Sequence, residues 1–260
     1  MAVQTSLFDL TGKVALLTGA SKGMGYSMAE GLAEHGANVV VSSRKIDQCE
    51  VACQEINEKV GRDAAVPMAC NIGYKEQLEN LVEQTRSKLG PIDILVSNAG
   101  INPFFGPMSQ IPDGAFDKIM NSNVRSNHWL CQMVSSDMIK SGSGSMMITS
   151  STGAFSGSMT LGTYNISKLA DIALVRNLAM ELGPNNIRVN AICPGLIKTD
   201  FAKALWDNPD AKKNAETNTP LRRLGEKEDL KGIAVFLASP ASAYITGQAI
   251  AVCGGTHMWR

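Results

Sequence analysis

The sequence has no excess of charge of either sign and few histidines. Lys plus Arg and Asp plus Glu number 24 each, so the formal net charge is zero. Binding to nucleic-acid phosphates needs a concentrated positive surface, and no run rich in Lys or Arg supplies one, so we expect no nucleic-acid partner. The three histidines are widely scattered, which leaves little from which to build a zinc site, and we expect no metal.

The sequence also lacks a disulfide pattern, a long apolar run and a targeting signal. The six cysteines contain no C-x-x-C pair and suggest no disulfide framework in a chain of 260 residues, which predicts a reduced, intracellular protein. No apolar run approaches the ~20 residues that span a bilayer, so we expect no membrane segment. Residues 1–13 do not resemble a signal peptide, and residues 257–260 are not a peroxisomal Ser-Lys-Leu signal, so we expect a cytoplasmic protein.

What the sequence does contain is an alternation of apolar, strand-like runs with helical patterns. Hydrophobic residues make up 44% and charged residues 18%, which favours a folded domain with a substantial core. The alternation predicts right-handed βαβ crossovers and a parallel sheet of about seven strands covered on both faces. The expected fold class is therefore α/β, a single doubly wound Rossmann-type domain over residues 1–260. We expect strands at 14–17, 39–41, 65–69, 92–96, 146–149, 187–192 and 249–252, and helices at 23–35, 48–60, 75–89, 116–139, 164–182 and 226–238.

One segment, residues 198–225, breaks this alternation. Its periodicity is weak, and it contains Pro209 and Pro220. A long irregular segment in a compact domain is more often functional than accidental, so we expect it to cover the substrate. A plain surface insertion is the alternative interpretation.

A glycine-rich turn follows the first predicted strand. Gly19 allows a sharp turn, and Gly23 and Gly25 leave room for a pyrophosphate to approach the backbone at the start of the next helix. A tight strand-to-helix turn without a ligand is the alternative, but the order of strand, glycines and helix is typical of dinucleotide binding. The residues expected to contact the cofactor here are Gly19, Ser21, Lys22, Gly23, Met24 and Gly25.

The end of the second predicted strand favours NADP(H) over NAD(H). An Asp or Glu usually accepts from the adenosine ribose of NAD at this position, whereas this chain has Ser43 and Arg44 and no carboxylate before Asp47. A guanidinium can hold a 2′-phosphate through charge-assisted hydrogen bonds, with Lys22 as a second positive charge. A solvated arginine at a strand end is the alternative.

A third cofactor motif follows the fourth predicted strand, beside the point where the strand order is expected to reverse. Ligands of open parallel sheets bind in the crevice at such a point. We therefore expect Asn98, Ala99 and Gly100 to line the cofactor cleft, the alternative being an ordinary strand-to-loop turn.

Tyr164 and Lys168 are the strongest catalytic candidates. They lie four residues apart at the start of a predicted helix, so they share one face. The pKa of a free tyrosine is about 10, and a nearby ammonium would lower it toward the working range. Ser150 and Ser151 end the preceding strand, and one of their hydroxyls could hydrogen-bond the substrate oxygen as charge develops on it.

These motifs together resemble the classical type of the short-chain dehydrogenase/reductase family over essentially the whole chain. Within that family the chain looks most like the tetrameric NADPH-dependent carbonyl reductases, a group that includes retinal reductases. The family motifs are Thr18-Gly-x-x-x-Gly-x-Gly25, Asn98-Ala-Gly100, Ser151, Tyr164-Asn-Ile-Ser-Lys168 and Pro194-Gly195 with Thr199. The closer likeness rests on Asn102-Pro-Phe-Phe-Gly106, Pro194-Gly-Leu-Ile-Lys-Thr199, Leu205-Trp206, Arg223-Leu-Gly-Glu226 and Tyr244-Ile-Thr-Gly247.

The resemblance implies a role for each matching residue. Tyr164 would donate the proton in reduction, and Lys168 would lower its pKa and bind the nicotinamide ribose. Ser151, rather than Ser150, would orient the carbonyl, and Asn123 would support a water relay behind Lys168. Further cofactor contacts would come from Asn71, Ile72, Pro194, Gly195, Ile197 and Thr199. The chain departs from the family at Ser97, where Asn is common, and at Asn71, where Asp is common.

The resemblance also implies a substrate class and an assembly. Hydride would pass from NADPH to a ketone or aldehyde, with a homotetramer formed through the helices at 116–139 and 164–182 and the C-terminal region. An alcohol or hydroxyacyl dehydrogenase and a non-catalytic NADP(H) sensor are the competing functions. The expected pocket wall lacks a cation for gripping an anionic substrate, which favours an uncharged carbonyl, although its last three members could simply pack a short helix. Its members are Phe104, Phe105, Phe155, Phe201, Leu205 and Trp206.

Overall fold

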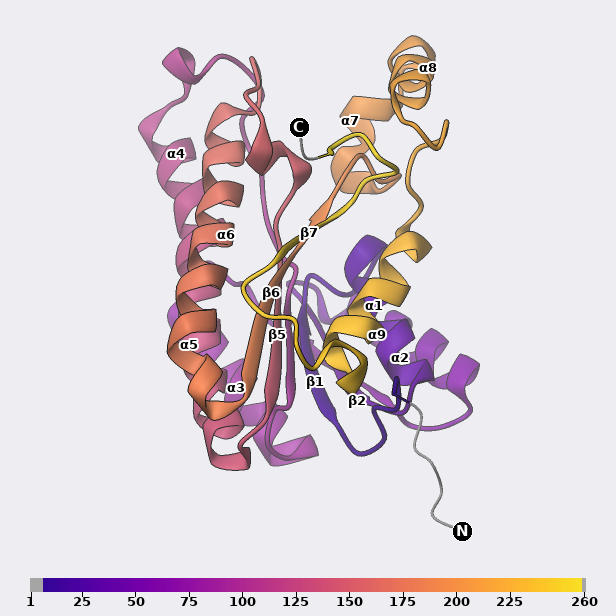
Figure 1. The fold of residues 1–260 in the computed structure, drawn as a ribbon, viewed down its shortest axis with the longest axis vertical. Helices are drawn as coiled ribbons and strands as arrows, with labels where there is room; N and C mark the ends of the chain where they lie inside the picture. The colour runs from indigo at the N-terminus through magenta and orange to yellow at the C-terminus, as the bar shows by residue number, and fades with distance from the viewer. Residues whose placement is uncertain (1–6, 259–260) are drawn as a thin grey trace.

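A seven-stranded parallel sheet forms the centre of the molecule (Figure 1). The computed structural model describes residues 7–258, so the targeting expectations that involve residues 1–6 and 259–260 lie outside it in part. The strand order is β3-β2-β1-β4-β5-β6-β7, and every neighbouring pair is parallel. The strands are β1 (Val14–Thr18), β2 (Asn38–Ser43), β3 (Ala65–Ala69), β4 (Ile94–Ser97), β5 (Gly144–Thr149), β6 (Ile187–Pro194) and β7 (Ala249–Val252). The predicted α/β fold with about seven parallel strands is confirmed.

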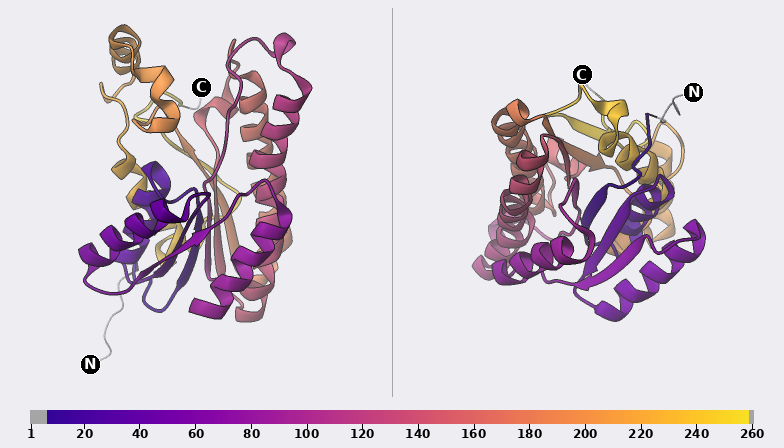
Figure 2. Two further views of the ribbon diagram at one scale, coloured as in Figure 1. Left: turned by 180° about the vertical axis from the view of Figure 1, so that it is seen from behind. Right: turned by 90° about the horizontal axis from the view of Figure 1, so that it is seen from below.

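Helices cover both faces of this sheet (Figure 2). Successive residues of β1 point to opposite faces, so Leu17 joins one core cluster and Leu16 the other. The first cluster receives α1 (Gly23–Glu34), α2 (Ile46–Val60) and α9 (Lys231–Ala238), and the second receives α3 (Lys75–Leu89), α5 (Ser126–Ser141) and α6 (Gly162–Leu182). Because both faces are covered, every residue of the central strands β1 and β4 is buried, and these strands are nearly continuous apolar runs.

Two predicted helices differ from the observed ones. The helix expected at 116–139 consists of α4 (Asp113–Met120), a π-helical segment (Asn121–Arg125) and α5, and these follow one another without a break. The helix expected at 226–238 begins as a 3₁₀ turn (Lys227–Leu230) before α9. No helix among the described residues is long and apolar enough to cross a membrane.

The prediction that residues 198–225 are irregular is wrong. We call residues 198–225 the covering segment, after the role expected for them. They contain a 3₁₀ turn (Asp200–Ala202), α7 (Lys203–Trp206) and α8 (Pro209–Asn218). The side chain of Asn208 accepts hydrogen bonds from the N–H groups of Asp210 and Ala211, and Pro209 occupies the first helical position, which is a favourable helix start. No residue of α8 is buried, so the sequence has no apolar periodicity there to reveal the helix.

Candidate active site

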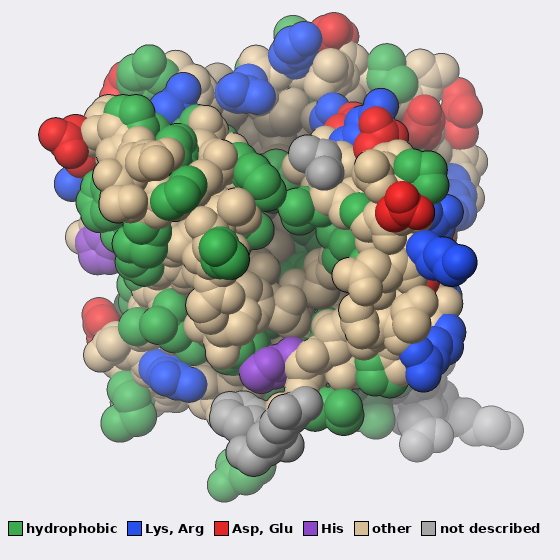
Figure 3. Space-filling model, turned by 90° about the horizontal axis from the view of Figure 1, so that it is seen from above, with side chains coloured by type: hydrophobic (Ala, Val, Ile, Leu, Met, Phe, Trp, Pro, Cys, Tyr) green, Lys and Arg blue, Asp and Glu red, His purple; other side chains and the backbone are tan. Residues whose placement is uncertain are grey.

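The predicted site residues gather where the parallel strands end. After β3 the chain crosses back past β1 to form β4, so the order reverses between β1 and β4, as expected. Figure 3 looks onto this end of the molecule and shows hydrophobic side chains around a central hollow. We call this hollow the cleft. The covering segment lies on one side of it and α6 on the other (Figure 1).

The turn after β1 forms a cradle that a pyrophosphate fits. Gly19 has a φ of +63°, and a Cβ added there would lie 2.8 Å from Ala99 Cα. A Cβ on Gly25 would overlap the carbonyl oxygen of Gly19. Lys22 precedes α1 without capping it through its side chain, so the first N–H groups of the helix remain available to an anion. Met24 packs its side chain against the first core cluster, and its backbone belongs to this helix start.

Asn98 braces this cradle. Its amide nitrogen donates to the carbonyl oxygen of Gly19 at 3.0 Å, and its amide oxygen accepts from the hydroxyl of Thr149 at 3.2 Å. The hydroxyl of Thr18 accepts from the backbone N–H groups of Asn98 and Ala99, each at 3.2 Å. Asn98 therefore ties together the ends of β1, β4 and β5. Sequence reasoning placed Asn98 at the cleft but missed the bracing threonines.

The residues expected at the 2′-phosphate lie at the end of β2. Arg44 is exposed and makes no hydrogen bond or ion pair with another residue between 7 and 258. Ser43 Oγ lies 3.3 Å from the carbonyl oxygen of Lys45 and 3.1 Å from Cys49 Sγ. Lys22 binds elsewhere, because its ammonium donates to Asp200 of the covering segment at 2.6 Å.

The residues after β3 and β6 differ in how their side chains face the cleft. Asn71 uses its amide oxygen to accept from the N–H of Gly73 at 3.1 Å, and Ile72 packs against the second core cluster. The methyl carbon of Thr199 would lie 3.4 Å from a Cβ on Gly23, which places Thr199 against the glycine turn. Ile197 is 5% exposed and packs in the first core cluster, so its backbone rather than its side chain is available to a cofactor.

Pro194 ends β6, and a Cβ on Gly195 would lie 2.8 Å from Cys253 Cβ.

Tyr164 is partly buried on the first turn of α6. The hydroxyl of Ser151 is close enough to the phenol to lower its pKa. Ser151 follows β5, and its hydroxyl also accepts from the N–H of Gly153 at 3.0 Å. Ser150 is buried and donates to the carbonyl oxygen of Lys168 at 2.8 Å, so its hydroxyl is occupied inside the protein. The structure thus brings Ser151, not Ser150, to the phenol.

Lys168 lies one turn behind Tyr164, and its ammonium is 5.8 Å from the centre of the phenol ring. The ammonium donates to the carbonyl oxygen of Thr149 at 2.9 Å and to the carboxylate of Asp171 at 3.0 Å. Burial alone would lower the pKa of Lys168, but Asp171 and Tyr164 outweigh it and raise this pKa. Sequence reasoning missed Asp171, although an acid seven residues after Tyr164, among the apolar positions of α6, was a readable signal.

The pKa of Tyr164 does not follow the sequence expectation. Burial raises the pKa of the phenol above its ordinary value, and the charge of Asp171 adds to this increase. The charge of Lys168 and the hydrogen bond from Ser151 oppose it without reversing it. In the protein without its ligands the phenol is therefore held in its protonated form.

Asn123 lies in the π-helical segment, close to the lysine. Its amide nitrogen donates to the carbonyl oxygen of Ile101 and to the hydroxyl of Ser167, both at 3.0 Å. A Cβ added to Gly100 would lie 3.5 Å from Asn123 Oδ1 and 3.6 Å from Lys168 Nζ. The side chains of Asn123 and Lys168 therefore lie close to Gly100 and to each other.

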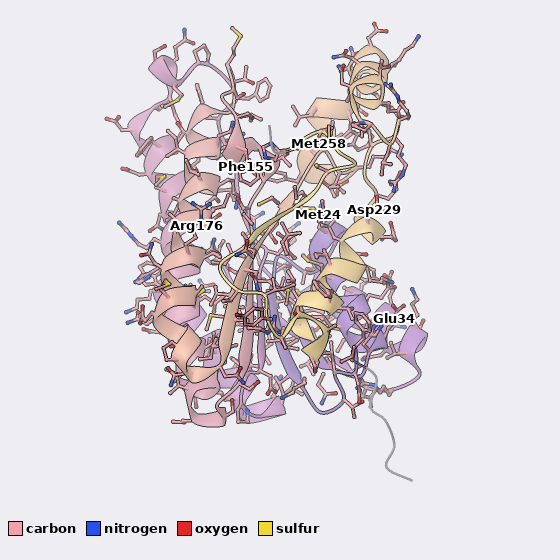
Figure 4. All side chains as sticks on the ribbon, in the orientation of Figure 1. Met24, Glu34, Phe155, Arg176, Asp229 and Met258 are labelled. Carbon is pink, nitrogen blue, oxygen red and sulfur yellow. The ribbon has the colours of Figure 1, made fainter. Side chains whose placement is uncertain are left out.

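Aromatic side chains approach Tyr164 from separate segments. The ring of Phe201 is centred 6.2 Å from that of Tyr164, and Phe104 lines a small pocket with Tyr164. Figure 4 shows Phe155 between α6 and the covering segment, where it stacks on His257 at 4.3 Å. Sequence reasoning missed His257. The other wall candidates are less enclosed: Phe105 is 60% exposed and Leu205 36%, while Trp206 donates to the carbonyl oxygen of Thr199 at 3.3 Å.

The chain matches known proteins over nearly its full length. Residues 19–257 match the family model described as enoyl-(acyl carrier protein) reductase. Dehydrogenase/reductase SDR family member 4 from Homo sapiens is 42% identical over 248 residues, which cover 95% of this chain and 88% of that relative.

Two similar solved structures are complexes with nicotinamide cofactors. A 7α-hydroxysteroid dehydrogenase, complexed with NADH and 7-oxo glycochenodeoxycholic acid, is 38% identical with a TM-score of 0.90, covering 95% of both chains. A gluconate 5-dehydrogenase from Burkholderia cenocepacia, in complex with NADP and tartrate, is 29% identical with a TM-score of 0.90, covering 96% of both chains.

Proposed function

Because the chain belongs to the short-chain dehydrogenase/reductase family of oxidoreductases, we propose that it reduces ketones or aldehydes with NADPH. The observation that carries this proposal is the grouping of Ser151, Tyr164 and Lys168 beside the glycine cradle. Tyr164 and Lys168 lie on successive turns of α6 and Ser151 follows β5, so the serine hydroxyl and the ammonium both act on the phenol. Such an arrangement suits proton transfer to a carbonyl oxygen.

Each catalytic residue has a distinct role in this proposal. Bound NADPH supplies the hydride that adds to the carbonyl carbon. Ser151 and Tyr164 hold the carbonyl oxygen, and the Tyr164 hydroxyl donates its proton to that oxygen as negative charge develops there. Lys168 keeps one N–H beyond its bonds to Thr149 and Asp171, and this N–H is available to the nicotinamide ribose.

The preference for NADPH rests on the end of β2. The solved relatives include complexes with NADH and with NADP, so family membership does not determine which of the two cofactors a member prefers. The residues at the end of β2 must decide this preference. Here Arg44 is exposed and unpaired among residues 7–258, and it can meet a 2′-phosphate directly. Ser43 supports the same contact from the neighbouring position.

The preferred substrate is an uncharged, apolar carbonyl compound. Phe104 and Phe201 both lie beside Tyr164, and Phe155 adds a further aromatic ring that stacks on His257. Aromatic walls favour apolar groups next to the reacting carbon. The bound 7-oxo steroid of one relative is a ketone of this general kind, although it carries an acid group.

A substrate screen separates this proposal from its alternatives. Ketones, aldehydes, diketones and the corresponding alcohols are incubated with NADPH, NADH or their oxidised forms, and the absorbance of the reduced nicotinamide is followed. We expect fastest turnover of apolar carbonyls with NADPH. Fastest turnover of alcohols at neutral pH would instead favour a dehydrogenase working in the oxidative direction.

The Tyr164→Phe variant tests for catalysis as such. It should lose about 10²- to 10⁴-fold in kcat while NADPH still quenches tryptophan fluorescence with the wild-type Kd. Ser158→Ala, which removes another hydroxyl from the same loop region, is the matched control and should keep its activity. A wild-type protein that binds NADPH but turns over no carbonyl or alcohol would support the sensor alternative.

We also propose a homotetramer in which α5 and α6 contribute to the interface. Ile166, Leu169 and Met180 form an exposed apolar stripe on α6, and Ile139 is exposed on α5. Such a stripe is typical of a surface that pairs with another chain. Light scattering after size exclusion should give four chains per particle, and Leu169→Asp should lower this number.

A further inference from the structure

A buried chain of polar side chains lies behind Lys168, and the reaction described above does not use it. The Ser97 hydroxyl donates to Asn127 Oδ1 at 2.6 Å, Asn127 Nδ2 donates to Asp171 Oδ1 at 2.8 Å, and Lys168 donates to Asp171 Oδ2 at 3.0 Å. None of these four residues is more than 4% exposed. The chain joins β4, α5 and α6 inside the protein.

The hydrogen bonds to Asp171 suit an ionised carboxylate: burial raises its pKa, and Lys168 and Asn127 oppose that increase. The backbone carbonyl of Asn123 can only accept, so the Asn127 atom 2.5 Å from it is the amide nitrogen. The same nitrogen contacts Asp171 Oδ1, which must therefore accept. Lys168 has donors and no acceptor, so Asp171 Oδ2 accepts as well.

A buried charge of this kind needs a reason beyond stability. A well-packed apolar residue in place of a buried ion pair is often neutral or stabilising, because desolvation of the two charges offsets their attraction. The buried positions of α6 that follow Asp171 are all apolar, beginning with Ile172 and Val175. Asp171 contacts no part of the cleft directly, so it acts through Lys168.

We propose that Asp171 is a positioning residue that holds the Lys168 ammonium from behind and keeps the Tyr164 hydroxyl protonated, so that the site donates protons over a wider pH range. This inference rests on the proposed carbonyl reductase activity. The positive charge of Lys168 favours the phenolate, and the negative charge of Asp171 partly cancels it. Asp171 thereby favours the state of Tyr164 that reduction needs, in which the O–H proton passes to the substrate oxygen as hydride reaches its carbon. Solvent then returns a proton to the phenolate.

Other titratable groups packed against this pair carry no charge at neutral pH. Cys131 of α5 faces Asp171, and burial raises the pKa of its thiol to about 12. Cys193 of β6 faces Lys168, and burial raises the pKa of its thiol to about 11. Tyr164, Lys168 and Asp171 themselves lie on α6. The charge balance at the phenol is therefore set by Lys168 and Asp171 together with the bound cofactor.

The test is the pH profile of the Asp171→Asn variant in both directions. The amide keeps the shape of the carboxylate and removes its charge. Loss of the charge lowers the pKa of both Tyr164 and Lys168, so both changes act in the same direction. The alkaline limit of kcat/KM for carbonyl reduction should move about one to two pH units lower, and the acid limit for alcohol oxidation should move lower as well.

Matched variants separate this effect from a loss of stability. Asp137→Asn removes the charge of another buried aspartate, which forms an ion pair with Arg86 of α3. Asp137 has no hydrogen bond or ion pair with Tyr164, Lys168 or Asp171 among the described residues. It should destabilise the fold and leave both pH limits unchanged, whereas Asp171→Glu should restore the wild-type limits. If Asp171→Asn does not fold, Asp171→Gln, which also removes the charge, should move the same limits, with Asp171→Glu as its charged counterpart.

The outcomes distinguish the two proposals. Wild-type protein without carbonyl reductase activity would overturn the proposed function. An active wild type that is inactivated by Tyr164→Phe, but whose pH limits do not move in Asp171→Asn or Asp171→Gln, would overturn the role of Asp171 alone.

Discussion

Two lysine–aspartate pairs flank the cleft, and they differ in burial rather than in geometry. Lys22 and Asp200 are 2.6 Å apart, with side chains 64% and 74% exposed. Lys168 and Asp171 are 3.0 Å apart, with side chains 4% and 0% exposed. The shorter pair is the weaker one, because water and salt screen its charges, whereas the buried pair is strongly coupled. Distance alone would rank them wrongly.

The difference in burial between the two pairs matches their positions on opposite sides of the cleft. The buried pair lies under Tyr164, where the chemistry needs charges that stay in one place. The exposed pair joins the glycine turn to the covering segment, beside the cradle in which we propose that the cofactor binds. On the proposed function, the fixed charges on the side of α6 would support catalysis, and the weak contact on the side of α7 and α8 would give way to the cofactor.

The largest contrast should come from replacing each lysine by methionine. Lys168→Met removes the charge beside the phenol and the donor to the ribose, and kcat for carbonyl reduction should fall about 10²- to 10⁴-fold. Lys22→Met should change kcat by less than ten-fold, because Lys22 is solvated and lies away from the reacting atoms. Steady-state kinetics with NADPH checks both. Similar losses in the two variants would break the comparison.

Stability should differ almost as strongly when each aspartate is replaced by leucine. Asp171→Leu leaves the Lys168 charge buried and unpaired, which should lower the free energy of unfolding by about 3–5 kcal/mol. Asp200→Leu should leave the urea midpoint unchanged. The double variant Lys168→Met with Asp171→Leu should recover much of the loss, since no unpaired charge remains. A double variant as unstable as the single one would point to packing rather than charge.

A third cation, Arg44, sharpens the comparison because it has no acidic partner among the described residues. Arg44→Asp replaces the expected 2′-phosphate contact by a repulsive charge, so the ratio of kcat/KM for NADPH to that for NADH should fall about 10- to 100-fold. Lys45→Asp, an equal change at the next exposed residue, is the control and should alter the ratio much less. An unchanged ratio in Arg44→Asp would remove the assignment to NADPH.

The sequence predicts most of the fold and part of the site, for physical reasons. All seven strands were found because each contains a short apolar run, including β7, which has no fully buried residue. Tyr164 and Lys168 were found because residues four apart lie on one face of a helix. Asp171 was missed because part of its hydrogen-bond network, Asn127 and behind it Ser97, comes from other elements of the fold. The substitution at Ser97 was visible, but its hydrogen bond to Asn127 was not.

The exposed parts of the cleft were the least predictable. α8 buries none of its residues and so has no apolar period, and only its capping by Asn208 reveals a helix start. The contact between Lys22 and Asp200 joins residues 178 positions apart, which no local pattern shows. The assignments of Ser43, Arg44 and the aromatic wall to cofactor and substrate stay predictions.

The smallest expected effect concerns the exposed pair itself. Lys22 was expected to support the 2′-phosphate, but in the structure its ammonium forms an ion pair with Asp200. Asp200→Asn frees that ammonium and removes a negative charge, so KM for NADPH should fall about two- to five-fold while KM for NADH stays the same. The difference should disappear near 1 M salt, where screening acts within about 3 Å. Asp207→Asn, which alters another exposed pair of the covering segment, is the control. A higher KM for both cofactors in Asp200→Asn would mean that the pair holds the covering segment over the bound cofactor rather than competing with it.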